Sequence, residues 1–147
     1  MSDRPVWHEL NGACHCGAIE VRYRTRFPVG TLHVGRCGCS FCRIHGARTS
    51  ADRGGHLEII ERPPGARRYR FGLRTADFLI CPGCGSYVAA VIRIDGADYA
   101  TLNVNILSDR DRFDPAPPIV HYDDETEAER RARRRDRWTP TTVRSVG

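Results

Sequence analysis

The sequence has 147 residues, enough for one modest hydrophobic core and too few for several domains. No segment approaches the roughly 18 consecutive apolar residues of a membrane-spanning helix, and the opening MSDRPVWHEL lacks the apolar run of a signal peptide. We therefore expect a cytoplasmic protein with no membrane partner. The net charge is +5 and all 23 basic residues are arginine, whose planar fork suits carboxylate and phosphate recognition.

Short segments typical of strands follow one another along most of the chain. Residues 18–24 alternate apolar and polar side chains, and residues 31–36 do so more weakly, as half-buried strands do. Turn residues separate the segments at 62–65, 82–86 and 95–98. The further predicted strands cover residues 56–60, 67–71, 77–81, 87–94 and 98–107. Seven short strands at near-regular intervals predict an antiparallel β domain without an internal repeat.

The chain changes character after the Pro-rich stretch at 114–118. An acidic run at 123–129 precedes six arginines and one aspartate within 130–137. Acidic residues in a first turn and basic residues in a last turn stabilise a helix through its dipole, so we expect a short solvated C-terminal helix. We therefore expect a β domain at 1–120 and a charged extension at 121–147, helical in part. A nucleic-acid contact through the arginines is the functional alternative.

The seven cysteines indicate metal binding rather than disulfides. A reducing cytoplasm disfavours disulfides, and an odd number leaves one thiol unpaired. The cysteines lie beside glycines at predicted strand ends, where the backbone can turn several thiolates toward one zinc ion. The C-x-x-C of CPGCGS is typical of a zinc knuckle, and no βαβ unit supports a redox role for it. We call the three groups the first pair, the middle trio and the last pair: Cys14 and Cys16; Cys37, Cys39 and Cys42; Cys81 and Cys84.

Two groupings of these cysteines satisfy the ligand count of zinc. In one, the first and last pairs form a closed site with four thiolates, and the middle trio forms a separate open site. In the other, the last pair takes two of the middle trio, and the remaining cysteines stay idle. We predict the first grouping because it uses all seven thiols, and because a catalytic zinc with three protein ligands keeps one position for water or substrate.

Three segments, GACHCGAIEVRY, CGCSFCRIHGA and FLICPGCGSYV, resemble in order and spacing the family of the glutathione-dependent formaldehyde-activating enzyme, which includes the centromere protein V type. The resemblance covers residues 10–107. It implies a β-tent fold of antiparallel sheets around a structural zinc, with a second, catalytic zinc in the same chain. The implied ligands are the first and last pairs for the structural ion and the middle trio for the catalytic ion: Cys14, Cys16, Cys81 and Cys84; Cys37, Cys39 and Cys42.

The ligand charges indicate what the catalytic zinc can do. A divalent ion and three thiolates carry one net negative charge, so such an ion is a weaker Lewis acid than one held by neutral histidines. A substrate thiol on the ion has its pKa lowered and is held as a thiolate, the form that attacks a carbonyl. The resemblance implies addition of a small thiol to a small aldehyde, or its reversal, with glutathione and formaldehyde as the substrates of the name-giving enzyme.

Residues beyond the cysteines have weaker signals. Arg43 directly follows the middle trio. It would either neutralise the charge of the site or bind a substrate carboxylate, and the alternative is an ordinary surface residue. His15 and His45 lie beside the cysteines in the sequence. They are either proton relays or ordinary turn residues. Ser86 follows CPGCG, where its hydroxyl would cap the knuckle or take part in catalysis. We predict packing roles for Trp7 and Trp138.

Three functions remain possible on these patterns. The leading hypothesis is a zinc-dependent carbon–sulfur lyase or synthase acting on a small thiol–aldehyde adduct. The second is a non-catalytic zinc-binding module that contacts nucleic acid or protein through the arginine-rich segment. The third is a zinc-holding or chaperone-like protein without turnover. Metal content and thiol chemistry distinguish the three.

Overall fold

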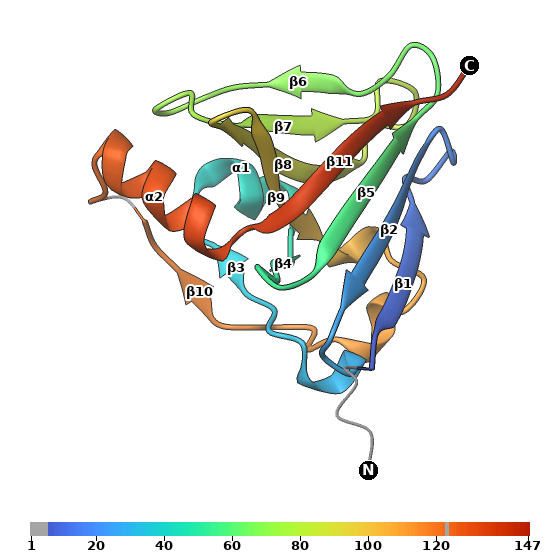
Figure 1. Cartoon of the computed structure of the whole chain (residues 1–147), viewed down its shortest axis with the longest axis horizontal. Helices are drawn as coiled ribbons and strands as arrows, with labels where there is room; N and C mark the ends of the chain where they lie inside the picture. The colour runs from blue at the N-terminus through green and yellow to red at the C-terminus, as the bar shows by residue number, and fades with distance from the viewer. Residues whose placement is uncertain (1–5, 123) are drawn as a thin grey trace.

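A computed structural model of the chain describes residues 6–122 and 124–147. Residues 1–5, at the start of the predicted β domain, and residue 123, the first of the acidic run, lie outside the described residues. The predicted mainly β fold with a short C-terminal helix is confirmed (Figure 1). No helix in the described ranges combines the length and apolarity needed to cross a bilayer.

A nine-stranded sheet forms most of the molecule. Its strands are β1 (His8–Ala13), β2 (Ile19–Thr25), β4 (Thr49–Ser50), β5 (His56–Glu61), β6 (Arg67–Tyr69), β7 (Asp77–Ile80), β8 (Tyr87–Ile94), β9 (Ala97–Asn103) and β11 (Thr139–Ser145). Their order is β1-β2-β5-β11-β9-β8-β7-β6, with β4 paired to β9. Figure 1 shows the sheet bent into two slopes, with β6, β7 and β8 on one side and β1, β2, β5 and β11 on the other.

The remaining elements are short. A second sheet pairs β3 (Arg36–Cys37) with β10 (Ile119–Val120), and the helices are α1 (Ser40–His45) and α2 (Glu127–Arg137). Three 3₁₀ turns occur in the described ranges, at Val29–Thr31, Val104–Ile106 and Arg110–Arg112.

The alternation of β2 predicted from the sequence places one face of the strand in the core. Ile19, Val21 and Tyr23 are each at most 1% exposed. By contrast, β8 is buried on both faces over its first six residues, because it lies between two hydrophobic clusters. Val88 and Ala89 belong to the larger cluster, beneath β1, β2 and β5. The smaller cluster includes Tyr87, Ala90, Ile92, Phe41, Cys42, Phe78 and Trp138.

Several predicted elements differ from those observed. The strand predicted at 31–36 is wrong over most of its length, since pairing starts only at Gly35, which forms an antiparallel bridge with Thr49, and continues at Arg36 and Cys37, which pair in parallel with β10. The strand predicted at 98–107 ends at Asn103, whose side chain accepts a hydrogen bond from the Asn105 N–H and starts a 3₁₀ turn. The sheet is mixed, because β11 runs parallel to β5. The longer strands β1 and β11 and the two-residue strands β4 and β10 were not predicted.

The C-terminal segment is built into the sheet. Helix α2 begins with a capping box in which Thr126 and Glu129 exchange side-chain to backbone hydrogen bonds. After α2, β11 enters the large sheet between β5 and β9. Trp138, at the junction, is buried as predicted. The other tryptophan, Trp7, is half-buried against the guanidinium groups of Arg24 and Arg26.

Candidate metal centres and the adjoining cavities

The first and last cysteine pairs meet at one point. Their four Sγ atoms all lie within 4.8 Å of one another. The Sγ atom of Cys16 lies 3.7 Å from that of Cys14 and 3.6 Å from that of Cys81. A tetrahedral zinc with Zn–S bonds of about 2.3 Å requires sulfur–sulfur separations of about 3.8 Å. The geometry of this four-sulfur group therefore fits a closed zinc site.

Turns at two strand ends hold the four-sulfur group. Cys14 follows β1, and its Sγ accepts a hydrogen bond from the Ile19 N–H at the start of β2. The last pair lies in the turn between β7 and β8, where Gly85 adopts a left-handed φ of 78°. The hydroxyl of Ser86 lies 3.3 Å from the Cys84 Sγ and accepts from the His15 N–H. These contacts support the capping role predicted for Ser86.

The two thiols of the last pair have opposite pKa shifts. Burial raises the pKa of Cys81 to about 11. Burial acts in the same direction on Cys84, but hydrogen bonds from the Ser86 side chain and backbone lower the pKa of Cys84 to about 5. The turn thus stabilises a thiolate at Cys84, the form in which a cysteine binds metal.

The middle trio forms a second group. The Sγ atoms of Cys37, Cys39 and Cys42 also lie within 4.8 Å of one another. Cys39 is the N-cap of α1, and its Sγ accepts a hydrogen bond from the Cys42 N–H at 3.4 Å. The ring of His121, next to β10, packs so closely on Gly38 that a side chain at position 38 would overlap it. Glycine at position 38 therefore leaves room for the His121 ring beside the three-sulfur group.

The pKa shifts in this three-sulfur group show that it suits a cation. Hydrogen bonds from Cys37 and Cys42 lower the pKa of Cys39 to about 2. Side-chain hydrogen bonds within the trio raise the pKa of Cys37 and of Cys42, because a thiol that donates to a thiolate keeps its proton, and burial and repulsion between thiolates add to the rise. A bound divalent cation removes that repulsion and lets all three sulfurs ionise.

Aromatic side chains pack behind the three-sulfur group. The ring of Phe41, on α1, lies 4.8 Å from that of Phe78 and 4.9 Å from that of Tyr87, both edge-on. Phe71 stacks on the same ring at 5.3 Å. Burial raises the pKa of Tyr87 well above its usual value, and the three nearby thiols raise it further, so the phenol stays protonated. The three cysteines pack with these rings in the smaller hydrophobic cluster.

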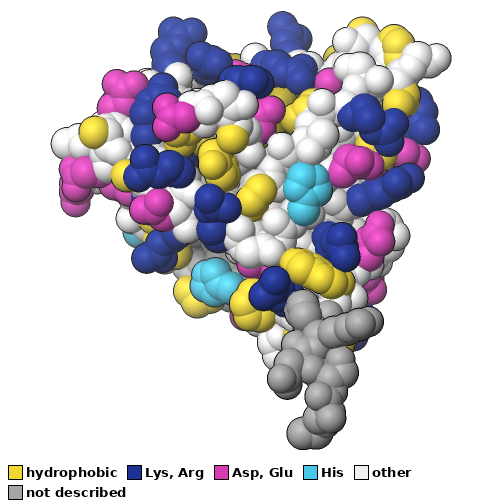
Figure 2. Space-filling view, in the orientation of Figure 1, with side chains coloured by type: hydrophobic (Ala, Val, Ile, Leu, Met, Phe, Trp, Pro, Cys, Tyr) yellow, Lys and Arg dark blue, Asp and Glu magenta, His cyan; other side chains and the backbone are white. Residues whose placement is uncertain are grey.

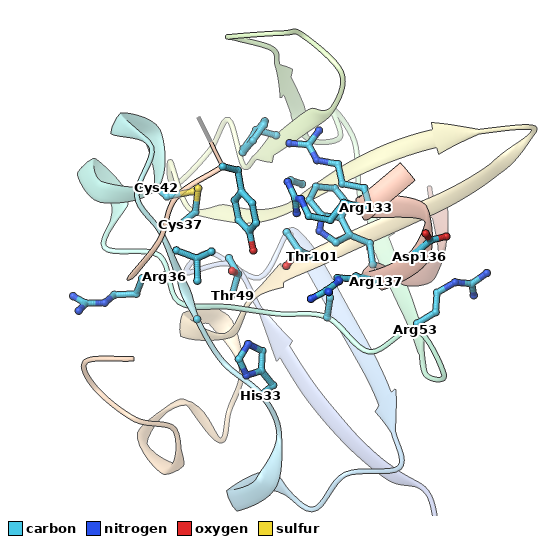
Figure 3. A pocket seen from close by; sticks show the side chains of 18 of the residues that line it. His33, Arg36, Cys37, Cys42, Thr49, Arg53, Thr101, Arg133, Asp136 and Arg137 are labelled. Carbon is cyan, nitrogen blue, oxygen red and sulfur yellow. The ribbon is translucent and has the colours of Figure 1, made fainter. Parts of the chain in front are cut away.

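The three-sulfur group borders two cavities, and Phe78 lines both of them. A cavity of about 430 Å³ is lined by Cys37 and Cys42, and one of about 330 Å³ is lined by Cys37 and Cys39. Figure 3 shows Cys37 and Cys42 on one side of the larger cavity and Arg133 and Arg137 on the other. Neither cavity is lined by a cysteine of the four-sulfur group.

Helix α2 supplies a wall to both cavities. Arg133 and Arg134 line the two cavities, together with Tyr122, and Arg137 lines the larger one. The sequence analysis predicted the helix but missed this role for its arginines. The charge pattern of the segment indicates where a helix begins and ends, and it does not indicate which arginines face inward.

The other predicted site residues lie outside the two cavities. Arg43 is exposed and lines neither cavity. His15 and His45 are also exposed. The Nδ1 atom of His45 lies 2.9 Å from the Phe41 carbonyl oxygen, as in a residue that closes the end of a short helix. These placements favour the surface and turn roles predicted for the three residues.

A sequence model of the glutathione-dependent formaldehyde-activating enzyme family matches residues 9–122. This range holds all seven cysteines in the two groups just described. The chain belongs to that family. The match ends before α2 and β11, so the α2 arginines that line the cavities lie beyond the region that the family model describes, whereas Arg36 and Arg53, which also line the larger cavity, lie within it.

A solved structure is similar to this member of the glutathione-dependent formaldehyde-activating enzyme family. The crystal structure of a Rhodobacter sphaeroides protein is 30% identical in sequence and superimposes with a TM-score of 0.53. The similarity covers 75% of this chain and 99% of the Rhodobacter chain. Among curated proteins, no match to the sequence was found.

Proposed function

We propose that the chain is a zinc-dependent carbon–sulfur lyase or synthase that joins a small thiol to a small aldehyde, or separates the two. The observation that carries the proposal is that three cysteine sulfurs converge beside two cavities, each lined by two of the three cysteines, and that the larger cavity has room for a small substrate. Family membership favours glutathione as the thiol and formaldehyde as the aldehyde, with S-(hydroxymethyl)glutathione as their adduct.

Two zinc ions per chain are part of the proposal. The first and last cysteine pairs would hold a structural ion, and Cys37, Cys39 and Cys42 would hold the catalytic one. When bound by three protein sulfurs, zinc offers a position at which the pKa of a substrate thiol is lowered. The protein itself positions Cys39 and Cys42 through the N-cap of α1, holds Cys37 on β3 and packs the three cysteines with Phe41 and its neighbours.

The proposed reaction needs no redox partner. The thiol sulfur attacks the aldehyde carbon, a carbon–sulfur bond forms, and the carbonyl π bond breaks. The proton lost by the thiol goes to the former carbonyl oxygen, and the reverse reaction returns it. The proposal includes a cytoplasmic location, since a reducing compartment keeps the thiols available to metal.

The alternative function, a nucleic-acid contact through the arginine-rich segment, has less support. Arg130 and Arg133 bind Glu125, and Arg134 is buried. Over the face seen in Figure 2, acidic side chains lie among the basic ones rather than apart from a single basic stripe. A nucleic-acid surface would require arginines of one face to point outward together.

A Cys39→Ser variant tests the proposed function. We expect zinc content to fall from about two ions to about one per chain, because serine is a poor zinc ligand. We expect the rate at which glutathione and formaldehyde exchange with their adduct, measured by NMR above the uncatalysed rate, to fall more than about 100-fold. The matched control is Ile44→Ala, an exposed position on the same helix that lines neither cavity.

The control should keep both ions and the full rate of exchange. The proposed function is contradicted if wild-type protein with two zinc ions does not accelerate the exchange. It is also contradicted if Cys39→Ser loses an ion and retains the wild-type rate.

A further inference from the structure

Arg134 is a buried arginine with an incomplete set of partners. It lies on the inner face of α2 and is 8% exposed. Its Nη1 atom donates to the Thr75 hydroxyl at 2.6 Å, and its guanidinium carbon lies 4.6 Å from the centroid of the Trp138 ring. The Nε atom is buried without a hydrogen-bond partner among the described residues. A buried guanidinium that is only partly satisfied destabilises the fold unless a further group binds it.

No carboxylate among the described residues forms an ion pair with Arg134. The nearby Glu125 is already engaged by two other arginines. Arg133 donates to both of its carboxylate oxygens, at 2.7 and 3.0 Å, and Arg130 donates at 3.3 Å. Arg134 therefore carries a positive charge that these side chains leave unbalanced.

The charge on Arg134 persists at neutral pH. Burial lowers the pKa of Arg134, as do the neighbouring charges of Arg133 and Arg130, but only to about 10. An anion that entered the adjoining space would meet a guanidinium that is already ionised and partly dehydrated. Charge-assisted hydrogen bonds formed in such surroundings are stronger than those formed in water.

Arg134 also lies beside the three-sulfur group. It lines both the cavity that Cys37 and Cys42 border and the cavity that Cys37 and Cys39 border. Thr75 lines the smaller cavity and orients the guanidinium through its hydroxyl. A molecule whose sulfur reached the three-sulfur group would thus have its remaining atoms within the space that Arg134 lines.

We propose that Arg134 binds a carboxylate of the thiol substrate, so that the enzyme selects thiols that carry a carboxylate over neutral thiols of the same size. The inference rests on the proposed function, because it takes the three-sulfur group as the place where the substrate sulfur binds. A planar carboxylate matches the planar guanidinium, and the Nε and Nη2 donors of Arg134 have no partner among the described residues. Arg134 acts here as a specificity-determining residue.

The test compares 3-mercaptopropionate with its amide, 3-mercaptopropionamide. The two ligands have the same thiol and nearly the same size, and they differ by one negative charge. Binding to the zinc-loaded protein is measured by isothermal titration calorimetry, without aldehyde and therefore without turnover. We expect the wild type to bind the carboxylate at least about tenfold more tightly than the amide.

The Arg134→Met variant should bind the two ligands equally. The matched control is Arg131→Met, since Arg131 belongs to the same helix, pairs with Glu127 and lines neither cavity. This control should keep the tenfold preference. Zinc content and circular dichroism show whether each variant is folded and loaded.

A second variant addresses the case in which Arg134→Met does not fold. Thr75→Val keeps the shape of the side chain and removes the hydroxyl that orients Arg134, so the preference for the carboxylate should fall below its wild-type value. Equal affinity of the wild type for the two ligands overturns the inference, as does an unchanged preference in a folded Arg134→Met or Thr75→Val protein. Equal affinity would indicate that Arg134 only balances the charge of the three thiolates.

The inference and the proposed function fail in different ways. If no thiol and aldehyde exchange is catalysed while the carboxylate preference holds, the proposed function fails and Arg134 still binds the anion. If exchange is catalysed while the two ligands bind equally, this inference alone fails.

Discussion

The four-sulfur and three-sulfur groups use the same ligand atom in different surroundings. Cys14 and Cys81 are 3% and 1% exposed and belong to the larger hydrophobic cluster. The three-sulfur group packs against the smaller cluster and borders two cavities. The first group ties together two turns that are far apart in the chain, between β1 and β2 and between β7 and β8.

The difference shows how one ligand type serves two purposes. Four sulfurs that converge from two turns can satisfy a tetrahedral ion completely, so a metal bound there would contribute to folding. Three sulfurs beside a cavity leave space for a group from outside. The chain separates the two purposes by placing the second group on β3 and α1, beside two cavities, rather than between two turns of the large sheet.

Serine variants should affect the two groups unequally. Cys84→Ser removes a ligand from the four-sulfur group, and we expect a loss of more than about 3 kcal/mol in the free energy of unfolding, because metal binding there is coupled to folding. Cys42→Ser should lose less, since the three-sulfur group connects only β3 and α1. Chemical denaturation of both zinc-loaded proteins measures the difference.

The matched comparison is between the two variants themselves, because each exchanges one sulfur for one oxygen. Equal losses of stability, or a larger loss for Cys42→Ser, would contradict the assignment of a structural role to the four-sulfur group. Zinc analysis of each variant should show that one ion has been lost.

Replacing the carboxylate of Glu125, which pairs with two arginines of α2, should have a smaller effect on the free energy of unfolding. The hydrogen bonds and positive charge of Arg133 lower the pKa of Glu125 from its ordinary value of 4.5. Arg130 acts in the same direction, and burial acts in the opposite direction. A carboxyl whose pKa is lower in the folded state than in the unfolded state stabilises the fold at pH values above its ordinary pKa. That contribution is lost as the pH falls through the folded-state pKa. Glu125→Gln should therefore lower the free energy of unfolding by about 1 kcal/mol at pH 7.

The difference between Glu125→Gln and the wild type should shrink as the pH falls below 4.5. Comparing the two proteins at each pH cancels the loss of metal that acid causes in both. A difference that stays constant between pH 7 and pH 3 would show that the ion pairs of Glu125 do not stabilise α2. The matched control is Glu127→Gln, an exposed carboxylate on α2 that pairs only with Arg131.

Much of the candidate site follows from the sequence. The number of cysteines, their spacing and the ligand count of zinc predicted which sulfurs converge, and the structure brings together the same two groups. The alternation in β2 predicted a strand, and the acidic-to-basic pattern in α2 predicted a helix, each close to its observed bounds. These features depend on local chemistry, which a single sequence displays directly.

Other features depend on long-range packing and were missed. β11 reads TPTTVRS, with proline and few apolar residues, and it forms a strand because β5 and β9 offer it partners on both sides. Arg134 looks like its neighbours in the sequence, and only the docking of α2 distinguishes the buried arginine from the exposed Arg135. The strand predicted at 31–36 is mostly irregular, because only its end reaches partners, Thr49 and β10.

Anomalous scattering at the zinc absorption edge tests the account most directly, in crystals grown with zinc and soaked with glutathione. We predict two zinc peaks per chain. One should be bound by four cysteine sulfurs, and the other by Cys37, Cys39 and Cys42 together with the sulfur of glutathione. A single peak, or a second ion whose four ligands all come from the protein, would contradict the account.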